Sequence, residues 1–163
     1  MLKREYYGWW YAVLAGSDEL FKKHPDVTQW NEDLLTTLLA LDVILALSTK
    51  DNNVVSNYSL PWKRDVILNK TAFFIKTYYH IINFCINNQL QHIRALNYLL
   101  NDTYIPIDYV VPLVMRLAKE HPDDVLHLQK LMGWLLGHPE SHAELLQLSE
   151  LMIAQPSKLK KPT

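Results

Sequence analysis

The stretch NEDLLTTLLALDVILALS, residues 31–48, is the most apolar run in the chain. Leu and Ala dominate it, Gly and Pro are absent, and Glu32 and Asp33 place negative charge in its first turn, so it favours an α-helix. Because apolar residues occupy nearly the whole circumference, we expect this helix to lie in a core. The uninterrupted apolar run is too short for a bilayer and contains Asp42, so we expect no membrane span.

Length and composition favour one globular domain. The chain has 163 residues, of which 49% are apolar and 20% charged, as is typical of a folded protein with a single core. We expect one helical domain over residues 1–156 and a flexible basic tail over residues 157–163. The formal net charge of −1 provides no field that would concentrate nucleic acid, so nucleic acid is not an expected partner.

The single cysteine and the N-terminus bear on the compartment. Cys85 has no second cysteine to pair with and lies among apolar residues, which fits a reducing environment. The N-terminal MLKREYYGWWYAVLAGSDE resembles a signal peptide in its basic start and apolar middle. However, its Trp, Tyr and Gly residues are unlike the aliphatic centre of such peptides. We therefore expect a cytoplasmic protein.

Helical periodicity extends over most of the remaining sequence. Apolar residues recur at helical spacing over residues 4–23, 65–87, 89–100 and 108–120, and Pro112 fits best in a first turn. Two further helices are predicted to open at Pro122 and Pro139, each after a His and before acidic residues, with Gly137 ending the first. Residues 50–63 lack this period and are predicted to form a loop.

These segments predict an all-α protein. We expect an irregular or orthogonal bundle of about seven helices, with a short α-solenoid of helical pairs as the alternative. The sequence contains no nucleotide-binding loop, dinucleotide fingerprint, HExxH pair, CxxC pair or nucleophile elbow. No motif therefore identifies a reaction.

Asp42 is the first candidate for a functional side chain. On a helical wheel it falls between Leu35, Leu38 and Leu45, on the most apolar side of its helix. Because burial of an unpaired carboxylate is costly, we expect Asp42 to have a partner or a raised pKa. A structural ion pair or hydrogen bond is the favoured interpretation, and a general base in a cavity is the alternative.

Histidines near the C-terminus are the second candidates. His138 and His142 are four residues apart, a spacing that can bring two imidazoles to one metal ion on a helix, and Asp and Glu residues lie nearby. His138 precedes Pro139, however, so it belongs to the start of the helix. Histidines that cap a helix or lie on its surface are therefore the favoured interpretation, and no cofactor is expected.

The outer side of the helix predicted from Pro122 is the third candidate. We expect one arc to face the core, formed by Val125, Leu128, Leu131, Met132, Leu135 and Leu136. The predicted partner-binding residues are those left outward and the acid at its start, namely Asp123, Leu126, His127, Lys130 and Trp134. An exposed Trp beside Leu and charged residues is typical of an interface hot spot. The alternative is that Trp134 packs within the monomer.

Three classes of function remain open at this point. The leading hypothesis is a non-catalytic protein-binding module, of the adaptor, inhibitor or toxin-neutralising kind, that acts through an aromatic and acidic surface. Its partner is another protein, and a homodimer is compatible with this. The alternatives are a metal-dependent hydrolase that uses the C-terminal His, Asp and Glu residues, and a binder of an apolar small molecule within the bundle.

Overall fold

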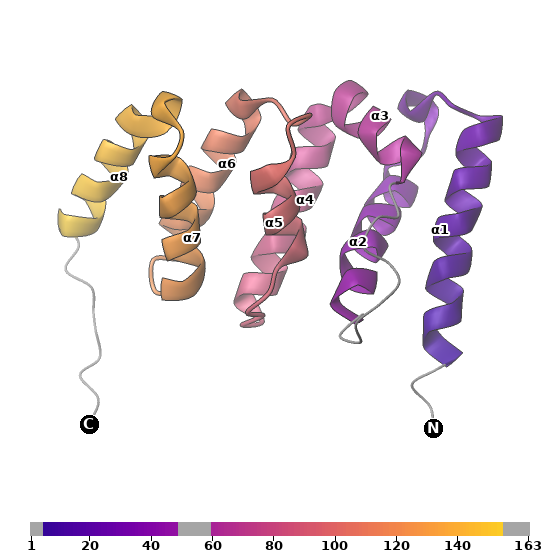
Figure 1. The fold of residues 1–163 in the computed structure, drawn as a ribbon, viewed down its shortest axis with the longest axis horizontal. Helices are drawn as coiled ribbons and strands as arrows, with labels where there is room; N and C mark the ends of the chain where they lie inside the picture. The colour runs from indigo at the N-terminus through magenta and orange to yellow at the C-terminus, as the bar shows by residue number, and fades with distance from the viewer. Residues whose placement is uncertain (1–4, 49–59, 155–163) are drawn as a thin grey trace. The chain divides into compact units, whose positions relative to one another are not determined.

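The computed structural model describes residues 5–48 and 60–154, and most of these residues are helical (Figure 1). They contain eight α-helices, two short 3₁₀ helices and no strand, which confirms the all-α prediction. The elements in chain order are α1 (Glu5–Lys23), η1 (Val27–Gln29), α2 (Glu32–Ser48), α3 (Pro61–Asn69), α4 (Thr71–Asn87), α5 (Arg94–Asn101), α6 (Ile107–Glu120), α7 (Val125–Leu136), η2 (Pro139–Ser141) and α8 (His142–Ala154). None of these helices has an apolar stretch long enough to cross a bilayer.

The chain divides into two compact units, which are described separately below. Unit 1 is Met1–Pro106 and contains α1 to α5, and unit 2 is Ile107–Thr163 and contains α6 to α8. The single domain expected over residues 1–156 stays a prediction. The arrangement of the helices as a bundle or as a solenoid also stays a prediction. The tail predicted over residues 157–163 lies outside the described residues.

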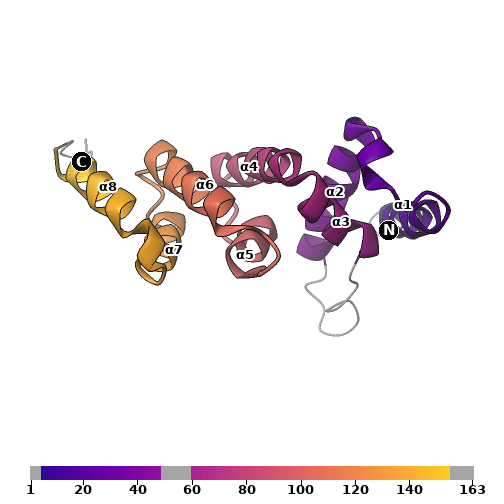
Figure 2. The same ribbon diagram turned by 90° about the horizontal axis from the view of Figure 1, so that it is seen from above.

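The helix predicted from residues 31–48 is the centre of unit 1. α2 lies between α1 and α4 (Figure 2) and also contacts α5. The Asn31 side-chain oxygen caps it, accepting hydrogen bonds from the backbone amides of Asp33 at 2.7 Å and Leu34 at 3.3 Å. Its core-facing side includes the buried residues Leu35, Leu38, Leu39 and Val43.

Buried indole and hydroxyl groups connect α1 to α3 and η1. α1 continues through Gly16 and Ser17 as predicted. The Ser17 hydroxyl donates to the Leu14 carbonyl at 2.6 Å and accepts from the Trp62 indole at 2.8 Å. The Trp30 indole donates to the His24 carbonyl at 2.9 Å. These bonds satisfy polar groups that would otherwise be costly to bury in an aromatic core.

The single helix predicted over residues 65–87 is wrong. The structure has α3 and α4 instead, separated at Lys70, whose φ of −131° and ψ of 42° are not helical. α3 begins at Pro61, inside the predicted loop, because the fixed φ of proline suits a first helical position. Trp62 is consequently a core residue with no exposed surface. The rest of that loop up to residue 59 lies outside the described residues.

Unit 2 is formed by α6, α7 and α8, each of which contacts the other two. α7 ends before Gly137 as predicted, but it begins at Val125 rather than Pro122. Pro139 opens η2, and α8 follows from His142. Pro112 lies in the second turn of α6 rather than the first, because α6 already begins at Ile107.

Candidate functional site

Asp42 pairs with Lys63 inside unit 1. Their atoms Oδ2 and Nζ are 2.6 Å apart, and the Asp42 and Lys63 side chains are only 12% and 8% exposed. The pair joins α2 to α3, so the partner expected for Asp42 comes from the helix that begins at Pro61. A carboxylate at this depth is stabilised by the opposite charge.

Two tyrosines enclose the Lys63 ammonium group. Its Nζ atom lies 3.6 Å from the Tyr98 ring centroid on α5 and 5.5 Å from the Tyr78 ring centroid on α4. The Tyr78 ring in turn stacks on Phe74, with centroids 4.2 Å apart. Cation–π attraction of this kind is stronger in a desolvated site than at the surface. Four helices therefore meet at one ammonium group.

Burial shifts the protonation equilibria of this cluster. Desolvation lowers the pKa of Lys63, although the negative charge of Asp42 opposes the shift. Desolvation also raises the pKa values of Tyr78 and Tyr98 well above the usual range. The Tyr78 hydroxyl is buried and has no hydrogen-bond partner among the residues that the structure describes. Since Asp42 and Lys63 already engage each other in a closed core, we interpret the cluster as structural.

The predicted partner-binding residues are not all exposed, although the helical wheel had indicated that they would be. Asp123, Leu126 and Lys130 are exposed, and Trp134 is half-buried with its ring stacked on His138 at a centroid distance of 3.8 Å. His127 is only 5% exposed, so its predicted outward position is wrong.

The start of α7 explains where His127 lies. Asp124 is the N-cap and accepts a hydrogen bond from the His127 backbone amide at 3.2 Å. The other oxygen of Asp124 lies 2.6 Å from His127 Nδ1, so the ring is drawn back toward the cap. Burial opposes ionisation of Asp124, but the bonds and charge of His127 together lower its pKa. His127 Nε2 is buried, and no group within residues 5–48 and 60–154 forms a hydrogen bond with it.

The predicted inner face of α7 is only partly covered. Leu131 and Leu135 are buried as predicted, whereas Val125 and Leu136 are exposed, which contradicts their assignment to the core. We define the outer face of α7 as the exposed arc formed by Val125, Leu126, Gln129, Lys130, Gly133 and Leu136. The apolar arc in the sequence is broader than the surface that α7 buries, which the sequence alone does not reveal.

In both His138 and His142, one ring nitrogen lies within hydrogen-bond distance of a backbone carbonyl oxygen. His138 Nδ1 lies 2.7 Å from the Trp134 carbonyl oxygen, and His142 Nε2 lies 3.1 Å from that of Leu136. Within residues 5–48 and 60–154, no three or more His, Cys, Asp or Glu side chains are grouped so that they could hold a metal ion. The described residues therefore offer no ligand set for the hydrolase hypothesis. Cys85 is buried, which raises the pKa of its thiol and disfavours the reactive thiolate.

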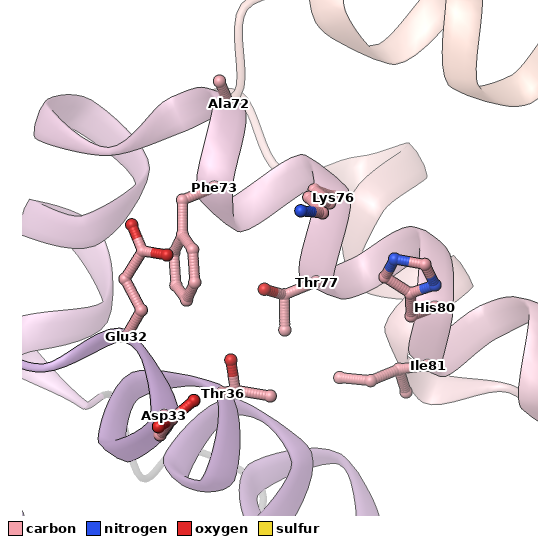
Figure 3. Close-up of a pocket in the computed structure, with 9 residues that line it drawn as sticks. All are labelled: Glu32, Asp33, Thr36, Ala72, Phe73, Lys76, Thr77, His80 and Ile81. Atoms are coloured by element: carbon pink, nitrogen blue, oxygen red, sulfur yellow. The ribbon is translucent and has the colours of Figure 1, made fainter.

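A pocket between α2 and α4 was not predicted from the sequence. It lies within unit 1, has a volume of about 470 Å³ and is open to solvent (Figure 3). Its lining residues are Glu32, Asp33 and Thr36 from α2 and Ala72, Phe73, Lys76, Thr77, His80 and Ile81 from α4. The sequence had indicated Glu32 and Asp33 only as signals of a helix start.

Comparisons of the chain with protein-family models, curated proteins and solved structures found no match. The functional argument therefore rests on the residues themselves.

Proposed function

We propose that this chain is a non-catalytic protein-binding module that contacts another protein through the outer face of α7. The exposure of three large apolar side chains on this one helix carries the proposal: Val125 is 69% exposed, Leu126 55% and Leu136 65%. Apolar side chains that gather on an exposed face are typical of interaction sites, whereas isolated ones are common anywhere on a surface.

Residues around this face support the same role. Asp123 and Lys130 supply a polar rim, which is usual around an apolar contact. A Cβ atom at Gly133 would meet nothing within 4 Å, so a partner backbone can approach closely there. Trp134 lies at the edge of the face, and its stack on His138 restricts the ring before binding, which reduces the entropy lost on association. The single buried thiol, Cys85, supports our placement of the protein in the cytoplasm.

Site-specific photo-crosslinking in the native cell tests this proposal. A photoreactive residue at Gln129 should give one dominant protein adduct, and the same residue at Gln29 of unit 1, which is also exposed, should not. Leu126→Asp combined with Leu136→Asp should abolish the adduct without loss of helicity, because both side chains are exposed. An adduct of twice the mass of the chain would identify the partner as a second copy. Identical adduct patterns from Gln129 and Gln29 would refute the proposal.

A further inference from the structure

The pocket between α2 and α4 has opposite charges on its two walls. Glu32 and Asp33 contribute carboxylates from the first turn of α2, while Lys76 and His80 lie one turn apart on α4 (Figure 3). Lys76 and His80 are exposed, so a ligand from solvent can reach them. A ligand that satisfies both walls must itself carry a positive and a negative group.

Apolar and hydroxyl groups complete the lining. Phe73 and Ile81 are half-buried on α4 and give the pocket an apolar surface. Thr36 and Thr77 extend into the space from the two helices, and their hydroxyls can bond to a polar ligand (Figure 3). Pockets that bind small molecules combine mainly apolar walls with a few polar groups in this way, and a volume of about 470 Å³ falls in their usual range.

We propose that this pocket binds a free apolar amino acid in its zwitterionic form. The ammonium group contacts Glu32 and Asp33, the carboxylate contacts Lys76 and His80, and the apolar side chain lies against Phe73 and Ile81. An amino acid carries one positive and one negative group, so a single small ligand offers a counter-charge to each wall. The residues of this site belong to unit 1, whereas the protein-binding face proposed above belongs to α7 of unit 2.

Titration of the ¹⁵N-labelled full chain with L-phenylalanine, followed by NMR, tests the assignment. We expect saturable shifts in the first turn of α2 and over residues 72–81, with a dissociation constant on the order of millimolar for so small a ligand. N-acetylphenylalanine lacks the ammonium group, and phenylalaninamide lacks the carboxylate. Each should bind about two- to fivefold more weakly, the usual effect of losing one exposed charge contact.

Exposed charges allow matched controls for the variants. Lys76→Gln and Glu32→Gln should each weaken phenylalanine binding by about the same two- to fivefold. Lys119→Gln on α6 and Glu144→Gln on α8 remove the same charges from exposed positions in unit 2 and should leave binding unchanged. Melting temperatures of all four variants should match that of the parent, since none of the four side chains is buried.

Three results would overturn the proposal. The first is the absence of saturable shifts up to the solubility limit of phenylalanine. The second is equal binding of phenylalanine and either blocked derivative, because then one charge makes no contact. The third is tighter binding of the dipeptides Phe-Gly and Gly-Phe, in which the two charges lie further apart; that would assign the pocket to peptides rather than free amino acids.

Discussion

The Lys63 ammonium group is buried beside the Tyr98 ring, so its charge must be compensated by the Asp42 carboxylate. Lys63→Met should lower the free energy of unfolding by about 3–5 kcal/mol, since it leaves the Asp42 carboxylate buried without a counter-charge. Urea denaturation measures this change. An equilibrium loss below about 1 kcal/mol, as is usual for surface ion pairs, would contradict the buried pairing.

The double variant Asp42→Leu with Lys63→Met is the control for this loss. It removes both charges together, so its stability should be well above that of Lys63→Met alone. A double variant as unstable as the sum of the two single variants would show that Asp42 and Lys63 act independently.

Loss of the hydroxyl should change the free energy of unfolding in opposite directions at Tyr78 and Tyr98. The Tyr78 hydroxyl is buried without a partner in the described part of the chain, so Tyr78→Phe should raise the free energy of unfolding by about 1 kcal/mol. Besides burial, interaction of the Tyr98 hydroxyl with Asp102 contributes to the raised pKa of Tyr98, so Tyr98→Phe, which removes this interaction, should lower the free energy of unfolding by about 1 kcal/mol. Parallel urea denaturation of the two variants tests this pair. A loss of stability in Tyr78→Phe would indicate that its hydroxyl has a partner.

At the scale of single residues, the sequence predicted the burial of Asp42 but not its partner. The apolar positions around Asp42 on the helical wheel were enough to require compensation of its charge. Lys63, by contrast, stands in a segment that lacks helical periodicity and becomes buried only because Pro61 starts a helix there. His127 was misplaced for a similar reason, since its contact with Asp124 depends on the exact first residue of α7.

Among the elements, the break between α3 and α4 shows most clearly why a prediction from the sequence failed. No Gly or Pro marks it, and apolar periodicity continues across it, so the sequence favoured one helix. Lys70 ends α3 and precedes α4 with no side-chain cap for the α4 amides. Instead, the Lys70 amine lies 3.5 Å from the Trp30 carbonyl oxygen, a tertiary contact that local sequence patterns do not show.

Lys70 therefore offers a test of α4 capping. Lys70→Asn should make α4 more stable than Lys70→Ala by about 1 kcal/mol, because Asn can accept a hydrogen bond from an α4 amide and Ala cannot. The comparison with Ala removes the effect of losing the lysine contact. Thermal unfolding followed by circular dichroism gives the difference. Equal stability of the two variants would mean that residue 70 does not act as the N-cap of α4.

The pocket illustrates the limit of prediction from single elements. Glu32 and Asp33 are adjacent in sequence, and Lys76 and His80 share a helix face, so each pair was visible. Their location on opposite walls of one pocket depends on how α2 packs on α4, which helical periodicity does not determine. The all-α class was predictable because it depends only on local periodicity.

For the whole molecule, the central question is whether the two compact units unfold together. A helical unit of about 60 residues is marginally stable by itself, so we expect the single-domain prediction to hold. Leu131 is 1% exposed in unit 2, and Leu131→Ala should destabilise by about 2–5 kcal/mol. Hydrogen exchange of the slowest amides should then accelerate equally in α1 to α5 and in α6 to α8.

Leu146→Ala provides the matched control for this experiment. Leu146 is 67% exposed in the same unit, so its loss should change exchange by less than the equivalent of about 0.5 kcal/mol. If Leu131→Ala accelerates exchange only in α6 to α8, the two units unfold separately and the prediction of one domain is wrong.

Because Lys63 is enclosed, the rate at which its amine is chemically labelled also reports how often unit 1 opens. An amine-reactive reagent reaches Lys63 only when the surrounding helices separate, whereas the exposed Lys76 reacts in the folded state. The ratio of the two labelling rates should report the fraction of molecules open at any moment. Acetylation of Lys63 in that open state removes its charge. The acetylated Lys63 would then no longer form the ion pair with Asp42. Each labelled molecule would therefore stay in the open state.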